Sequence, residues 1–144
     1  MSTPSHDTDF FGWTRQQAHL LRTGRLDQLD VVNLIDEIED MGKSQIRELE
    51  SRLGVLLAHL LKWRYQPDRL VVSWESTIRE QRRRLTLLLA DNPSLQPRLP
   101  KAHDDAYGDA RLIARRETAL PEPTFPATSP FSLEQTLDPD YWPG

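Results

Sequence analysis

Residues 44–65, SQIRELESRLGVLLAHLLKWRY, decide the fold expected for this chain. Read at about 100° per residue, they form an amphipathic helix with one apolar stripe. Ser44 supplies an N-cap, and Pro67 ends the helix because proline lacks an amide hydrogen and displaces the preceding residue from helical geometry. Such a helix must pack against other helices to keep its stripe from water. The stripe consists of Ile46, Leu49, Leu53, Leu56, Leu57 and Leu60.

Further helices are expected on both sides of this one, each bounded by capping or breaking residues. Gly42 favours a break just before the central helix, because Gly costs about 1 kcal/mol relative to Ala inside a helix. Ser44 offers a new cap directly after that break. The flanking helices are expected from Asp7 or Asp9 to Gly24, from Val31 to Met41, from about Ser73 to Ala90, and from about Lys101 to Thr118.

The C-terminal segment, residues 121–144, holds six of the eleven prolines. That density excludes a long helix, yet the segment keeps several large apolar side chains, which a disordered linker would lack. Ser132 and Gln135 form a capping-box pattern for a short helix at residues 133–137. We expect the segment to wrap over the other helices as a strap. The alternative is a docking segment for a partner.

Length and composition bound the class of protein. A chain of 144 residues with 38% hydrophobic and 28% charged residues is ordinary for one soluble globular domain. It has no cysteine, no secretory signal pattern and no apolar run of the ~20 residues that would span a membrane. We therefore expect a cytoplasmic all-α protein, built as a compact bundle of about five helices. Residues 1–8 would be flexible, 9–120 would form the bundle, and 121–144 would be the proline-rich strap packed on it.

Several motifs are distinctive in combination: MGKS, HLLKWRYQP, SWESTIREQR and the closing FSLEQTLDPDYWP. In this combination the chain resembles the bacterial domain-of-unknown-function family 29 (DUF family 29) from Asp9 to Pro143. The resemblance implies a compact all-helical fold and no assigned activity. It therefore carries no catalytic residue over to this chain.

His59 is the most tempting single residue for chemistry, since imidazole titrates near neutrality. Together with Glu37 and Arg82 it would form the active site of a small hydrolase-like enzyme. The structural alternative is a histidine packed on Trp63 and hydrogen-bonded between helices, the commoner fate of a lone histidine. The pattern therefore favours a protein that is not an enzyme.

Metal-binding motifs are missing from the sequence. Neither Glu-x-x-His nor His-Glu-x-x-His occurs, and the four histidines are scattered over separate segments. Glu37 and Glu39 fall on opposite borders of their helix, which is a poor geometry for sharing one ion. We expect neither a metal nor another cofactor.

A basic run covers residues 62–84, with seven basic against three acidic residues, while residues 27–50 hold eight acidic against two basic. Complementary helices packed on each other would explain both excesses. The alternative is a nucleic-acid-associated protein that uses the basic face, although the net charge of −4 argues against it. The candidate phosphate-binding residues are Lys62, Arg64, Arg69, Arg79, Arg83 and Arg84.

Arg82 is expected to point inward, within about 40° of the apolar midline of its helix. A buried cation needs a carboxylate partner, and Glu37 or Glu39 is the predicted one. The four tryptophans come from four segments, so a shared aromatic core is expected. The residues with expected structural roles are Trp13, Trp63, Trp74, Glu39 and Arg82.

The leading functional hypothesis is a non-enzymatic structural or protein-interaction module, acting through its own surface or by self-association. Its partner would be another protein or a second copy, with nucleic acid less favoured and no membrane involved. No motif in the sequence identifies the partner.

Overall fold

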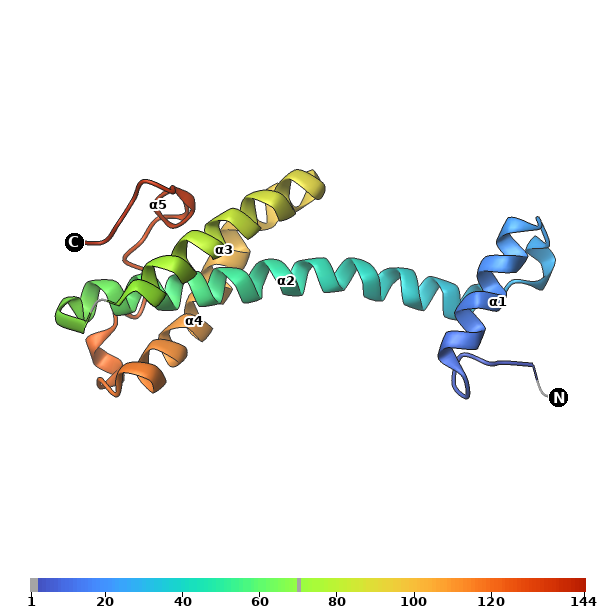
Figure 1. The fold of residues 1–144 in the computed structure, drawn as a ribbon, viewed down its shortest axis with the longest axis horizontal. Coiled ribbons are helices and arrows are strands. Elements are labelled where there is room, and N and C mark those ends of the chain that lie inside the picture. The colour runs from blue at the N-terminus through green and yellow to red at the C-terminus, as the bar shows by residue number, and fades with distance from the viewer. Residues whose placement is uncertain (1–2, 70) are drawn as a thin grey trace. The chain divides into compact units, whose positions relative to one another are not determined.

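The computed structural model describes residues 3–69 and 71–144, and within these ranges the chain forms α- and 3₁₀-helices and no strand (Figure 1). The all-α prediction is confirmed. The α-helices are α1 (Phe10–Arg22), α2 (Val31–Tyr65), α3 (Val72–Asp91), α4 (Leu99–Thr118) and the short α5 (Leu133–Leu137). The 3₁₀-helices are η1 (Leu26–Gln28), η2 (Pro67–Arg69), η3 (Pro93–Arg98) and η4 (Glu122–Thr124).

The predicted break at Gly42 is wrong, because α2 continues through this residue as one helix. Gly42 is exposed, and apart from its chain neighbours and the backbone of its own helix no described atom lies within 4 Å of the place where its Cβ would be. The cost of a single glycine, about 1 kcal/mol, is outweighed by the hydrogen bonds that each added residue contributes to a growing helix. Ser44 is therefore an internal helical residue and not a cap.

The chain divides into two compact units, Met1–Ser44 and Gln45–Gly144, here called unit 1 and unit 2. Residues 31–44 of α2 belong to unit 1, and the rest of α2 belongs to unit 2. The two units differ in how completely they bury their apolar side chains.

Unit 1 is a helix pair, formed by α1 and residues 31–44 of α2, with a thin core. On α1 the buried residues are Trp13, Gln17 and Leu20. The carboxylate of Asp9 caps α1 by accepting from the amide of Gly12 at 3.0 Å. After the helix, Gly24 adopts a φ of 74°, a left-handed conformation that ends it. The large apolar side chains of residues 31–41 stay largely exposed.

Unit 2 contains the main core. The leucines of the central stripe, from Leu49 to Leu60, are fully buried against α3 and α4. Figure 1 shows these two helices beside the C-terminal part of α2. On α4, small residues allow close approach to α2, with the carbonyl oxygen of Ala106 lying 3.8 Å from the position of a Cβ at Gly54. Ile78 and Leu85 bring α3 into the same core.

The proline-rich segment contributes directly to the core of unit 2. Phe125 and Phe131 are 0% and 2% exposed. The guanidinium of Arg111 donates to the carbonyl oxygen of Phe125 at 3.1 Å, which fixes the segment to α4. Ser132 and Gln135 form the predicted capping box at the start of α5.

Candidate functional site: an apolar groove in unit 1

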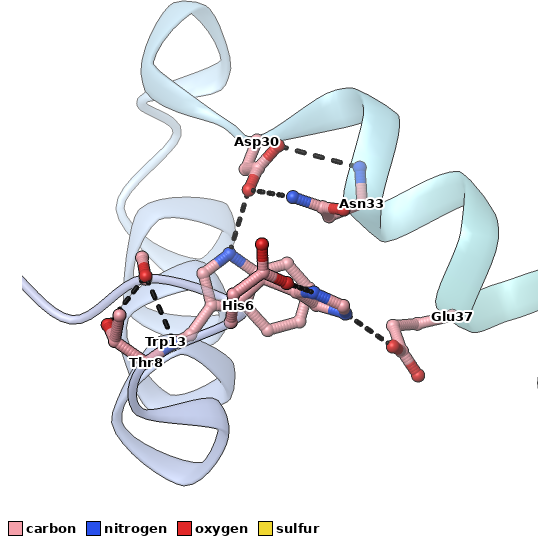
Figure 2. Close-up of polar contacts among 8 residues, drawn as sticks. His6, Thr8, Trp13, Asp30, Asn33 and Glu37 are labelled. Atoms are coloured by element: carbon pink, nitrogen blue, oxygen red, sulfur yellow. Dashed lines mark hydrogen bonds and ion pairs between the residues drawn. The ribbon is translucent and has the colours of Figure 1, made fainter.

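A hydrogen-bonded cluster around Asp30 joins the two helices of unit 1 (Figure 2). The Asp30 carboxylate accepts from Trp13 Nε1 at 3.0 Å and from Asn33 Nδ2 at 2.8 Å. Its main-chain amide donates to Gln17 Oε1 at 2.8 Å. The hydrogen bond from Asn33 lowers the pKa of Asp30, so this cluster holds a carboxylate at the start of α2.

His6 ties the N-terminal segment to α2 (Figure 2). Its Nε2 lies 2.6 Å from Glu37 Oε1, and its Nδ1 lies 3.0 Å from Asp7 Oδ1. The imidazole also meets the Trp13 ring edge-on, with centroids 4.9 Å apart. The hydrogen bond to Glu37 raises the pKa of His6, because it stabilises the charged imidazolium.

An apolar groove of about 360 Å³ lies between the two helices of unit 1. Phe10 and Leu21 of α1 are 48% and 52% exposed, and Ile38 and Met41 of α2 are 64% and 66% exposed. The contributing positions recur every three or four residues on both helices, as in grooves that accept a further helix. The groove is lined by Phe10, Trp13, Thr14, Gln17, Ala18, Leu21, Leu34, Glu37, Ile38 and Met41.

Charges of opposite sign lie on the two helices that form the groove. In α1 the charged residues are Arg15 and Arg22, and no acidic residue occurs. In residues 31–44 of α2, Asp36, Glu39 and Asp40 are all exposed. None of these five side chains forms an ion pair with any other described residue. Unit 1 therefore presents an apolar surface together with unpaired charges of both signs.

The three residues of the hydrolase hypothesis each have separate partners. His59 Nδ1 lies 2.8 Å from the carbonyl oxygen of Val55, one turn earlier in α2. Burial lowers the pKa of His59. Glu37 is bound to His6, as described above, and Arg82 binds main-chain carbonyl groups in the C-terminal segment. Within the described part of the chain no hydrogen bond or ion pair joins these three side chains.

Arg82 is buried, as expected, at 4% exposure, but the predicted ion pair with Glu37 or Glu39 does not form. Arg82 Nε donates to the carbonyl oxygen of Thr136 at 2.9 Å, and Nη2 donates to that of Gln135 at 3.2 Å. The physical reason is that carbonyl oxygens left over at the end of a short helix can accept the hydrogen bonds of a guanidinium. Glu39 is exposed.

The basic residues predicted to bind phosphates do not share one environment. Lys62 is 4% exposed, and its Nζ lies 3.2 Å from Glu117 Oε2 and 5.3 Å from the centroid of the Trp74 ring. On α3, Arg79 pairs with Glu75 at 3.0 Å, and Arg84 pairs with Glu80 at 4.0 Å. The residues that form no ion pair with a described residue are Arg64, Arg69 and Arg83.

The tryptophans pack in separate places. Trp13 is in the core of unit 1, while Trp63 lies against Trp142 with ring centroids 4.7 Å apart. The guanidinium groups of Arg79 and Arg82 also lie over the Trp142 ring, at 5.4 and 5.5 Å. Trp142 thus holds the C-terminal segment by contacting both α2 and α3.

The described residues contain no group of three or more histidine and carboxylate side chains placed to hold a metal ion. Among the helices of residues 3–69 and 71–144, none combines the length and the apolar character that crossing a membrane requires.

Fold and surface together define an all-α protein with one well-packed helical unit and one unit that exposes an apolar groove. The sequence profile of the family described as "Domain of unknown function DUF29" matches residues 5–142. The chain therefore belongs to this family, as the resemblance predicted. No curated protein and no solved structure is significantly similar to it.

Proposed function

We propose that this protein is a non-enzymatic interaction module that self-associates through unit 1. The apolar groove between α1 and α2 is the observation that carries the proposal. A second copy of the same helix pair is the occupant, and the two pairs pack into one four-helix assembly. The composition, which has no cysteine, agrees with a protein of the bacterial cytoplasm.

The thin core of unit 1 supplies the driving force for self-association. Only three side chains of α1 are buried, while four large apolar residues of the groove are about half to two-thirds exposed. Each square ångström of apolar surface removed from water contributes roughly 25 cal/mol, and a small helix pair gains little from its own core. Contiguous apolar surface of this kind is typical of an interaction site.

The charges of unit 1 favour a second copy over another occupant. A helix that complements the acidic residues 31–44 of α2 should be amphipathic and basic, and α1 is such a helix, with Arg15 and Arg22 and no acidic residue. In a two-fold symmetric interface every contact occurs twice, so α1 of one copy would meet α2 of the other on both sides. The side chains that lack an ion pair in one copy would then find partners in the other.

Analytical ultracentrifugation of the full chain and its variants tests the proposal. The wild-type protein should be a dimer at micromolar concentration, whereas Ile38→Glu and Met41→Glu should be monomeric with unchanged helical circular dichroism. Val72→Glu is the matched control, because Val72 is an exposed residue of α3 in unit 2, and it should remain dimeric. A monomeric wild type at about 100 µM, well above typical dissociation constants of stable dimers, would exclude self-association.

A charge exchange shows whether the partner is a second copy. Replacing Arg15 and Arg22 by Glu should weaken the dimer about tenfold or more, since like charges would then face each other. Adding Glu39→Lys and Asp40→Lys to the same chain should restore it, because each α1 would again meet an oppositely charged α2. If neither set of substitutions changed the dissociation constant of the dimer, the interface would lie elsewhere.

A further inference from the structure

A second candidate site lies in unit 2, around the guanidinium of Arg82. This side chain is 4% exposed and directs Nε and Nη2 to carbonyl oxygens. Its remaining nitrogen, Nη1, is buried and has no hydrogen-bond partner among the described residues. A buried donor without an acceptor is unusual in folded proteins and requires an explanation.

The charge of Arg82 is also incompletely balanced. No carboxylate lies within ion-pair distance of its guanidinium in residues 3–69 and 71–144. The Trp142 ring, 5.5 Å away, offers a cation–π contact, and Asp138 acts only at longer range. Burial lowers the pKa of Arg82 and Asp138 opposes this. A carbonyl oxygen is a dipole and cannot replace a full counter-charge.

A cavity of about 220 Å³ adjoins this residue. Arg83 brings a second guanidinium that forms no ion pair with a described residue, while Arg79 is bound to Glu75. Among the described residues no acidic side chain lines the cavity, whose walls are Arg79, Arg82, Arg83, Thr86, Leu137 and Pro139. The volume is below that of pockets for drug-sized molecules, about 300–1,000 Å³, and suits a small ligand.

We propose that this cavity binds a phosphate-type oxyanion, either free or as the phosphoryl group of a small monoester. Arg82 and Arg83 supply the positive charge, and guanidinium groups match the oxygens of phosphate in a bidentate manner. An anion in the cavity provides the counter-charge that Arg82 lacks. This site is separate from the self-association proposed for unit 1.

Isothermal titration calorimetry tests the site. It measures the binding of inorganic phosphate to the full chain, with the ionic strength held constant by chloride. Wild type should bind phosphate saturably, with a dissociation constant in the millimolar range or below, and Arg83→Gln should raise that constant about tenfold. Arg84→Gln is the matched control on the same helix, since Arg84 pairs with Glu80 and does not line the cavity. It should bind as wild type does.

Arg82→Lys gives a second check, because it keeps the charge and removes the planar fork. It should also weaken phosphate binding, while circular dichroism reports whether the fold is kept. Glycerol phosphate in place of phosphate identifies the source of the anion: tighter binding indicates a monoester, and weaker binding indicates free phosphate. Absence of saturable binding at about 20 mM phosphate, or equal losses in Arg83→Gln and Arg84→Gln, would overturn the proposal.

Discussion

At the scale of single residues, the pKa values of the histidines in this protein are shifted in different directions by what the side chains touch. His6 is hydrogen-bonded to Glu37, which raises its pKa. His103 is buried on α4, with its Nε2 2.8 Å from Thr136 Oγ1, and burial lowers its pKa. The contributions of His6 and His103 to stability therefore change with pH in opposite directions.

The signs follow from linkage. For His6 the folded pKa lies above the unfolded value of about 6.5, so its contribution is complete below that pH and is lost as pH rises through the folded pKa. For His103 and His59 the folded pKa lies below that value, so their contribution is present above pH ~6.5 and is lost as pH falls. NMR titration of the imidazole signals should place His6 above, and His59 and His103 below, an unfolded reference. Titration of His103 above His6 would contradict this account.

Thr136 offers a second residue-scale prediction. It is 0% exposed, donates to the carbonyl oxygen of Ser132 at 2.8 Å and lies against His103 Nε2. Thr136→Val keeps the shape and leaves the buried imidazole donor without an acceptor, so it should cost about 1–3 kcal/mol. Urea unfolding measures the change. Thr128→Val, at an exposed position, should change the free energy of unfolding by less than about 0.5 kcal/mol.

At the scale of elements, the sequence identified most helices from periodicity and caps, including the small α5. It was wrong at Gly42, because a local cost of about 1 kcal/mol does not by itself end a helix. The hydrogen-bond partners of Arg82 could not be predicted from the sequence. They are main-chain carbonyl oxygens of the C-terminal segment, and every residue has such an oxygen, so no residue type marks them. The exposure of the groove residues could not be predicted, because it depends on how few helices unit 1 contains, which periodicity does not reveal.

The glycines of unit 1 test these helix ends. Gly42→Ala should stabilise the protein by about 0.5–1 kcal/mol, because alanine is the better helix former and its Cβ would clash with no other described part of the chain. Gly24→Ala should destabilise it by about 1 kcal/mol, since a φ of 74° strains a residue that has a Cβ. Thermal unfolding of the two variants should shift in opposite directions. A gain in stability from Gly24→Ala would rule out the left-handed helix end.

At the scale of the whole molecule, burial is divided unequally between the two units. Unit 2 holds the buried leucines of α2 and both buried phenylalanines of the tail. Unit 1 buries few side chains. The net charge is divided unequally as well: unit 1 has eight acidic and four basic residues, which gives −4, the value for the entire chain.

Hydrogen exchange should reflect this division. In the Met41→Glu variant the amides of α1 should exchange fastest among the long helices, and those of residues 49–62 slowest, because local opening is easiest where few apolar contacts exist. In the wild type the amides of α1 should be more protected, since dimer formation would cover them. Mass spectrometry of peptic fragments measures both. Equal protection of α1 in the two proteins would argue against an interface in unit 1.

The burial of Lys62 has a practical consequence. The chain has three lysines, Lys43, Lys62 and Lys101, and Lys62 alone is shielded from solvent among them. An amine-acylating reagent should therefore modify the other two at once and reach Lys62 only when the packing between α2 and α4 opens. The rate at which Lys62 is acylated would measure how fast this packing opens, without any engineered probe.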